Sequence, residues 1–140
     1  MKEGLFFALL GISILFVGGC GSNSETALNA KDSITLADAP DKAIWEIDAI
    51  SRLPFDADRQ RAYKAIARRT NLHETVQTYL IQAVFDHLTF EEAKEDVLLT
   101  IIRNPSFNGK SRTAILGRID TLVFENDRER ILRAINRSKI

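Results

Sequence analysis

Cysteine is nearly absent from this sequence, and its scarcity already excludes several kinds of protein. A single cysteine in 140 residues rules out a disulfide framework and a cysteine-based zinc site. Lys plus Arg and Asp plus Glu each number 19, and this lack of excess positive charge argues against a dedicated nucleic-acid binder. Apolar residues make up 45% and charged residues 27% of the chain, as in ordinary globular proteins, so neither a disordered nor a multi-pass membrane protein is expected.

The longest uncharged run, residues 4–24, lies near the N-terminus. Its apolar core, residues 5–17, has about the length of the hydrophobic region of a signal peptide and is short for a membrane span of roughly 20 residues. The core ends in Val17-Gly18-Gly19-Cys20, which resembles the lipobox of bacterial lipoproteins. That resemblance implies signal-peptidase recognition of Val17, Gly18 and Gly19, cleavage before Cys20, and a diacylglyceryl thioether on the Cys20 sulfur.

An uncleaved membrane anchor is the alternative for this segment, because residues 4–24 are just long enough to span a bilayer. Either interpretation places the domain on the far side of a membrane, to which its N-terminus is tethered. We therefore expect a signal peptide at 1–19, a lipidated cysteine and flexible spacer at 20–40, and a folded domain at 41–140. The spacer is predicted because its residues are small and polar and have no sustained period.

From residue 41 onward the apolar pattern is helical, and it occurs in three copies. The copies begin at Phe55, Phe90 and Phe124, at spacings of 35 and 34 residues. Apolar residues at positions 0, +7, +8 and +11 from each Phe predict one buried stripe of an α-helix. Other positions also recur: +1 is acidic (Asp56, Glu91, Glu125), +4 is basic (Arg59, Lys94, Arg128) and +13 is arginine (Arg68, Arg103, Arg137).

The segments between these copies are predicted to be helical too, since one of them has a single apolar stripe of Leu72, Val76, Leu80, Val84 and Leu88. The fold class is therefore all-α. We expect six helices in three stacked hairpins, forming a short α-repeat array or a compact bundle after the N-terminal signal or anchor helix. The expected ranges are 41–53 with 55–69, 71–88 with 90–103, and 107–122 with 124–138. Asn71 with Glu74 and Thr89 with Glu92 are spaced like capping boxes. Gly117, inside the fifth range, suggests a close helix crossing.

A period near 34 residues is also that of tetratricopeptide repeats, but their Trp, Leu-Gly and Tyr pattern is absent. Over about residues 53–137 the chain more closely resembles an uncharacterised bacterial helical-repeat domain whose units start with Phe-Asp-x-Asp-Arg. This resemblance implies no particular activity. A single helix pair cannot bury its apolar stripe, so stacking of the pairs is expected to create the core.

The charged residues are expected to be mainly structural. The +1/+4 pairs suit first-turn acids and i,i+3 ion pairs. The domain contains a dense set of arginines, among which Arg59, Arg61, Arg128 and Arg130 are the candidate anion-binding residues. A solvated helix face is the plainer explanation of these arginines, because acidic residues lie close to each of them.

Other candidate sites are weaker. His73 and His87 lie too far apart along one helix to share a metal ion, so they are expected to be solvated or capping residues and no metal site is predicted. Asn108-Gly109-Lys110-Ser111 lacks the strand and the upstream glycine of a phosphate loop, so neither a nucleotide nor another cofactor is expected. Trp45, Tyr63, Tyr79 and Phe85 are predicted to be core residues, with Tyr79 and Phe85 nearest the surface.

The sequence favours a lipid-anchored cell-envelope protein that acts as a non-enzymatic protein-interaction module. It would lie on the outer membrane or on the extracytoplasmic face of the plasma membrane. The expected partners are the membrane, through the N-terminal lipid, and an envelope protein, with no nucleic acid. Three alternatives remain open: binding of envelope polyanions through the arginine-rich helices, a cell-wall enzyme, and a homo-oligomeric scaffold.

Overall fold

The computed structural model describes residues 40–138; the predicted signal peptide, lipobox and most of the spacer lie outside this range. The described residues form six α-helices, one 3-10 turn and no strand. The elements are α1 (Pro40–Ser51), α2 (Asp56–Ala67), α3 (Glu74–His87), α4 (Glu91–Ile102), α5 (Gly109–Leu116), η1 (Ile119–Thr121) and α6 (Glu125–Arg137). The all-α class is therefore confirmed. None of these helices has the length and apolar character needed to cross a lipid bilayer.

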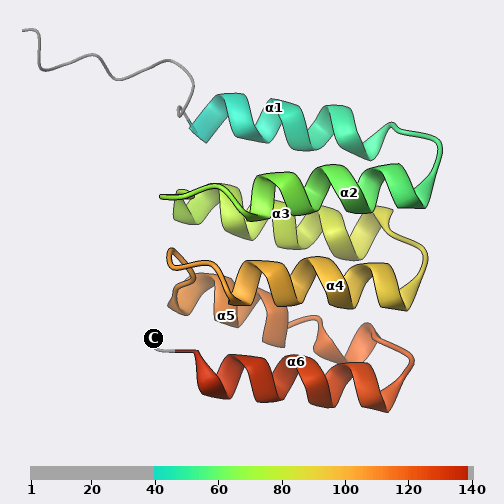
Figure 1. The fold of residues 1–140 in the computed structure, drawn as a ribbon, viewed down its shortest axis with the longest axis vertical. Coiled ribbons are helices and arrows are strands. Elements are labelled where there is room, and N and C mark those ends of the chain that lie inside the picture. The colour runs from blue at the N-terminus through green and yellow to red at the C-terminus, as the bar shows by residue number, and fades with distance from the viewer. Residues whose placement is uncertain (1–39, 139–140) are drawn as a thin grey trace, which may run out of the picture. The chain divides into compact units, whose positions relative to one another are not determined.

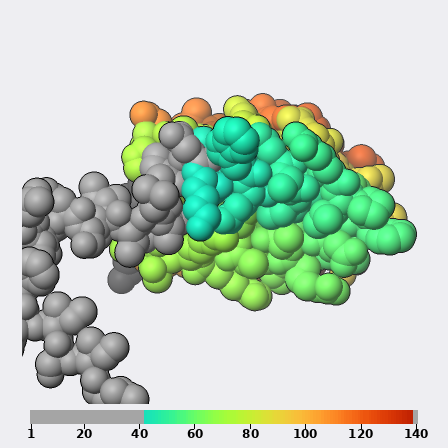
Figure 2. Space-filling model, turned by 90° about the horizontal axis from the view of Figure 1, so that it is seen from above, coloured from blue at the N-terminus to red at the C-terminus, as the bar shows by residue number. Residues whose placement is uncertain are grey.

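The helices are arranged in two layers (Figure 1). In one layer α3 packs between α1 and α5, and in the other α4 packs between α2 and α6. Successive helices run in opposite directions, so α1 with α2 and α3 with α4 form hairpins, while the third pair is less regular because η1 intervenes between α5 and α6. Figure 2 looks onto the end of the stack that α1 and α2 cover. The α3–α4 hairpin is thus enclosed on both sides.

The core follows most of the predicted helical stripes. The residues expected to share one face of the predicted helix 71–88 are all buried: Leu72, Val76, Leu80, Val84 and Leu88. The +11 isoleucines Ile66, Ile101 and Ile135 are buried as well. At position +8, Tyr63 and Leu98 are buried but Leu132 is exposed. Leu132 differs because α6 is the last helix of the described stack, and none of the described hairpins lies on its outer side.

The predicted single helix at 107–122 is wrong, because the chain leaves the helix at Gly117. α5 ends at Leu116, Gly117 is its C-cap, and η1 follows. The predicted close crossing at Gly117 is also wrong: the atoms nearest to an added Cβ are the carbonyl oxygens of Thr113 and Ala114, within α5 itself. Glycine is a poor helix former, and the N–H of Arg118 closes the last turn on the Ile115 carbonyl, 3.0 Å away.

Neither predicted capping box forms. The N-cap of α3 is His73, whose Nδ1 accepts the N–H of Thr75 at 3.3 Å, while Asn71 is in the left-handed region at φ 57°, which asparagine tolerates better than most residues. The N-cap of α4 is Phe90, which makes no side-chain capping bond. The acceptor for the start of α4 comes instead from α2, as described below.

Candidate interaction surface

The phenylalanines that begin the three copies are exposed rather than buried. Phe55, Phe90 and Phe124 are the N-caps of α2, α4 and α6, and their side chains are 67%, 67% and 60% exposed. Their predicted place in the buried stripe is wrong. Helical periodicity holds only for residues with helical backbone angles, and an N-cap has an extended backbone outside that register. The backbone at all three positions is extended, with φ/ψ near −107/135° at Phe55.

These side chains share one edge of the stack, which we call the aromatic edge: Phe55, Phe90, Val123 and Phe124. It is the edge at which α2, α4 and α6 begin, on the right in Figure 1. Packed helices lie about 8–10 Å apart, so an exposed apolar side chain recurs at that interval along the edge. Contiguous exposed apolar groups of this kind are typical of interaction surfaces. The edge lies opposite the one at which α1 begins.

Behind the aromatic edge, acidic residues link each hairpin to the next. The Asp56 carboxylate accepts the N–H groups of Thr89 and Phe90 at 3.0 and 3.1 Å and pairs with Arg59 at 2.7 Å. Burial raises the pKa of Asp56, but the hydrogen bonds from Arg59, Phe90 and Thr89 outweigh it and leave the pKa below 3.8. The first copy of the +1/+4 pair is therefore structural, and its main role is to bridge two hairpins.

The second copy repeats the bridge, and the third does not. The Glu91 carboxylate accepts the N–H of Val123 at 3.2 Å and pairs with Lys94 at 2.9 Å. The equivalent Glu125 is exposed, because α6 is the last helix of the described stack. The two bridges hold neighbouring phenylalanines at a fixed spacing. The sequence showed an acidic residue at the same position of each copy. It did not show that the carboxylates of Asp56 and Glu91 accept hydrogen bonds from the next hairpin.

The four candidate anion-binding arginines are not brought together. Arg59 and Arg61 lie on α2 and Arg128 and Arg130 on α6, with α4 between the two helices. Arg59 also donates to the Leu53 carbonyl at 2.6 Å, and Arg130 donates to Glu95 at 2.7 Å and Asp127 at 2.6 Å. The hydrogen bond to Glu95 raises the pKa of Arg130 above its ordinary value. Arg61 makes only a long, exposed contact with Asp58 at 3.4 Å.

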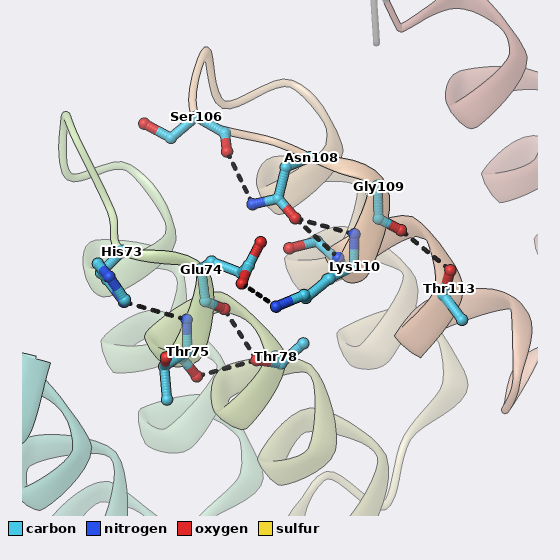
Figure 3. A network of polar contacts seen from close by, with 10 residues as sticks. His73, Glu74, Thr75, Thr78, Ser106, Asn108, Gly109, Lys110 and Thr113 are labelled. Carbon is cyan, nitrogen blue, oxygen red and sulfur yellow. Dashed lines mark hydrogen bonds and ion pairs between the residues drawn. The ribbon is translucent and has the colours of Figure 1, made fainter.

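Polar contacts join the starts of α3 and α5 (Figure 3). The Asn108 side chain caps α5 by accepting the N–H groups of Lys110 and Ser111 at 3.0 and 3.1 Å, and Lys110 pairs with Glu74 at 2.6 Å. The Ser111 hydroxyl donates to the buried Gln77 at 2.9 Å. In the segment Asn108-Gly109-Lys110-Ser111, which was compared with a phosphate loop, the polar side chains therefore cap α5 and hold it against α3.

Two of the four predicted core aromatics are buried. Tyr63 and Phe85 are in the core, and the Arg118 guanidinium lies 5.1 Å from the centre of the Phe85 ring. Tyr79 is partly buried and its hydroxyl donates to Asp48. Trp45 is 75% exposed, so its predicted place in the core is wrong. Ala43 and Ile47 face the core, and a residue midway between them points to the opposite side of α1.

The remaining candidates carry no metal chemistry within the described residues. His73 caps α3 and His87 is the exposed last residue of the same helix. Across residues 40–138, no group of three or more His, Cys, Asp or Glu side chains is arranged to hold a metal ion. In comparisons with known proteins, no family model, curated protein or solved structure matches this chain. The surface feature that the described residues do show is the exposed apolar side chains of the aromatic edge.

Proposed function

We propose that this protein is a lipid-anchored envelope protein that acts as a non-enzymatic protein-interaction module, with the aromatic edge as its contact surface. One observation carries the proposal: three phenylalanines at equivalent positions are exposed, each at the start of one of the helices α2, α4 and α6, which begin at the same edge of the stack. These phenylalanines occupy the N-cap positions, but their side chains neither make capping hydrogen bonds nor fill the core. Aromatic side chains are enriched at protein–protein interfaces, and stacked repeats provide extended surfaces for such contacts.

The geometry of the stack supports this use. The bridges made by Asp56 and Glu91 fix the spacing of the phenylalanines, so a partner meets a preorganised row and loses less conformational entropy on binding. The aromatic edge also lies opposite the edge at which α1, and with it the described chain, begins at Pro40. A helix of 12 residues is about 18 Å long. A partner can therefore approach the aromatic edge at a distance from the anchored side.

Photo-crosslinking in the bacterial cell tests the contact surface. A benzoylphenylalanine in place of Phe90 is expected to give a discrete adduct with one envelope protein, whereas the same probe in place of Trp45, which is at least as exposed, is expected not to. Replacing Phe55 and Phe124 by serine should weaken the Phe90 adduct. Equal labelling from positions 90 and 45 would show that the aromatic edge is no preferred contact.

The anchor is tested separately, by the intact mass of the protein extracted from membranes. A lipoprotein gives a mass that begins at Cys20 and includes acyl chains, and Cys20→Ala abolishes this form. A mass that begins at Met1, together with Cys20→Ala remaining in the membrane, would contradict lipidation and indicate an uncleaved anchor. The crosslinking result does not depend on which of the two is found.

A further inference from the structure

We propose that the edge opposite the aromatic edge binds phosphate-bearing anions through three arginines in a row, Arg68, Arg103 and Arg137. This site is independent of the proposed protein contact, because it uses other residues at the other ends of the same helices. The three arginines occupy position +13 of the three copies. Arg68 and Arg103 are the C-caps of α2 and α4, and Arg137 is the last residue of α6.

These arginines are free, unlike most other arginines of the domain. All three are exposed, and within residues 40–138 none of them forms an ion pair. The charge of Arg68 is felt by Asp96, but that carboxylate is hydrogen-bonded to Lys64 at 2.6 Å and Gln60 at 2.7 Å. The guanidinium groups therefore keep their donors for a ligand.

Two hollows lie along this row. The larger, about 480 Å³, is lined by Arg103 and Arg137 together with the apolar side chains of Ile102, Phe107 and Ala134. The second, about 320 Å³, is lined by Arg68 and Arg103. Arg103, Asn104 and Pro105 line both hollows, so the two are neighbours at this edge. Each hollow is lined by two arginines, a number that suits one anionic group in each.

Phosphate is the anion that this chemistry favours. The planar guanidinium fork of arginine donates two parallel hydrogen bonds to phosphate oxygens. The free carbonyls at a helix C-terminus carry partial negative charge, which would repel an anion. At the end of α2, two carbonyls, those of Ala67 and Arg69, already accept hydrogen bonds from the Asn104 amide at 2.7 and 2.9 Å. Arginine at a helix end also stabilises the helix itself, but that role requires neither the hollows nor their apolar wall. The apolar wall of the larger hollow accommodates a carbon substituent on the phosphate.

Calorimetric titration of the full chain in a neutral detergent tests the site with two probes. Tripolyphosphate represents a soluble oligophosphate, and short-chain phosphatidylglycerol below its micelle concentration represents a lipid headgroup, with short-chain phosphatidylcholine as its zwitterionic control. We expect Arg103→Gln to weaken binding of the preferred anion by about tenfold or more, and Arg68→Gln or Arg137→Gln to weaken it less. Arg112→Gln removes an exposed arginine of α5 that forms no ion pair with the other described residues and should leave affinity unchanged.

Each outcome decides the proposal. Salt-sensitive binding of either probe that is lost in Arg103→Gln supports the site, and the probe that binds identifies the source of the phosphate. If neither probe binds, or if Arg112→Gln weakens binding as much as Arg103→Gln, the arginine row is no anion site. Thermal unfolding of each variant distinguishes a lost ligand contact from a lost fold. A loss of stability in Arg103→Gln with unchanged affinity would show that Arg103 serves only its helix.

Discussion

At the scale of single residues, Tyr63 shows how the core accommodates a polar group. Its side chain is fully buried and its hydroxyl has no hydrogen-bond partner among the described residues. The ring contributes volume to the core, and the titratable groups that act on its hydroxyl are Arg59 of α2, Asp48 of α1 and Tyr79 of α3. Burial raises the pKa of the Tyr63 hydroxyl to about 12, because the ionised form would lie in an apolar environment.

Tyr63→Phe is therefore expected to leave stability unchanged or to raise it by up to roughly 1 kcal/mol, because it removes an unpaired buried hydroxyl. The folded state holds its proton to higher pH than the unfolded state, so the wild type should lose stability as the pH rises from 10 toward 12, and Tyr63→Phe should lose less. Urea unfolding at pH 7 and above pH 10 measures both effects. Tyr79→Phe is the contrast, since it deletes a hydrogen bond to Asp48. A clear loss of stability in Tyr63→Phe at pH 7 would contradict this account.

At the scale of elements, the contact between α2 and the start of α4 shows how the hairpins are joined. The first turn of α4 has no cap of its own, and Asp56 supplies the acceptor from the preceding hairpin. Gln77 has a similar role between α3 and the segment before α5: its amide donates to the carbonyls of Leu72 and Ser106 at 2.8 and 2.7 Å. Polar side chains thus set the register between helices whose apolar faces alone would permit sliding.

Asp56→Ala is expected to lower the free energy of unfolding by about 1–3 kcal/mol, since two backbone N–H groups lose their acceptor. Asp58→Ala, on the same helix turn, removes only an exposed 3.4 Å ion pair with Arg61. It should change the free energy of unfolding by less than about 0.5 kcal/mol. The folded pKa of Asp56 lies below 3.8, so its contribution is present above that pH and is lost as the pH falls below it. Denaturant unfolding of both variants at pH 7 and pH 3 measures this; a deficit in Asp56→Ala that is as large at pH 3 as at pH 7 would count against it.

At the scale of the whole molecule, burial depends on position in the stack. The α3–α4 hairpin is covered by a neighbour on each side, whereas α1, α2 and α6 each have one open side. The exposed Trp45 and Leu132 lie on α1 and α6. In a stacked array each hairpin gains stability from its interfaces, so the middle one has the most to gain.

We therefore expect backbone amide hydrogens in α3 and α4 to exchange with solvent most slowly, and those in α1 and α6 most rapidly. Hydrogen-exchange mass spectrometry of the full chain checks this order. Asp56→Ala should accelerate exchange at the start of α4 more than at the end of α3, because it releases the N–H groups of Thr89 and Phe90. Uniform protection from α1 to α6 would instead mean that the domain opens only as one unit.

Much of the fold was predictable because it depends on local pattern. Apolar spacing placed the helices within a few residues, and the stripe from Leu72 to Leu88 is buried as expected. Several errors fall at helix termini, at Phe55, Phe90 and Gly117, since backbone angles change there and periodicity no longer applies. The repeated +13 arginines were visible in the sequence, but the hollows beside them were not, because those are formed by side chains from different hairpins.

The sequence by itself determined that the domain is helical, that it consists of three related copies, and which face of each helix is apolar. These properties arise from spacing along one chain segment. The tertiary structure alone decided that the three phenylalanines are exposed at one edge and that Trp45 is exposed. It also decided that Asp56 accepts a hydrogen bond from the start of α4, 33 residues away. The physical reason is that exposure and hydrogen bonding depend on which hairpin lies alongside, and helical periodicity carries no information about neighbours.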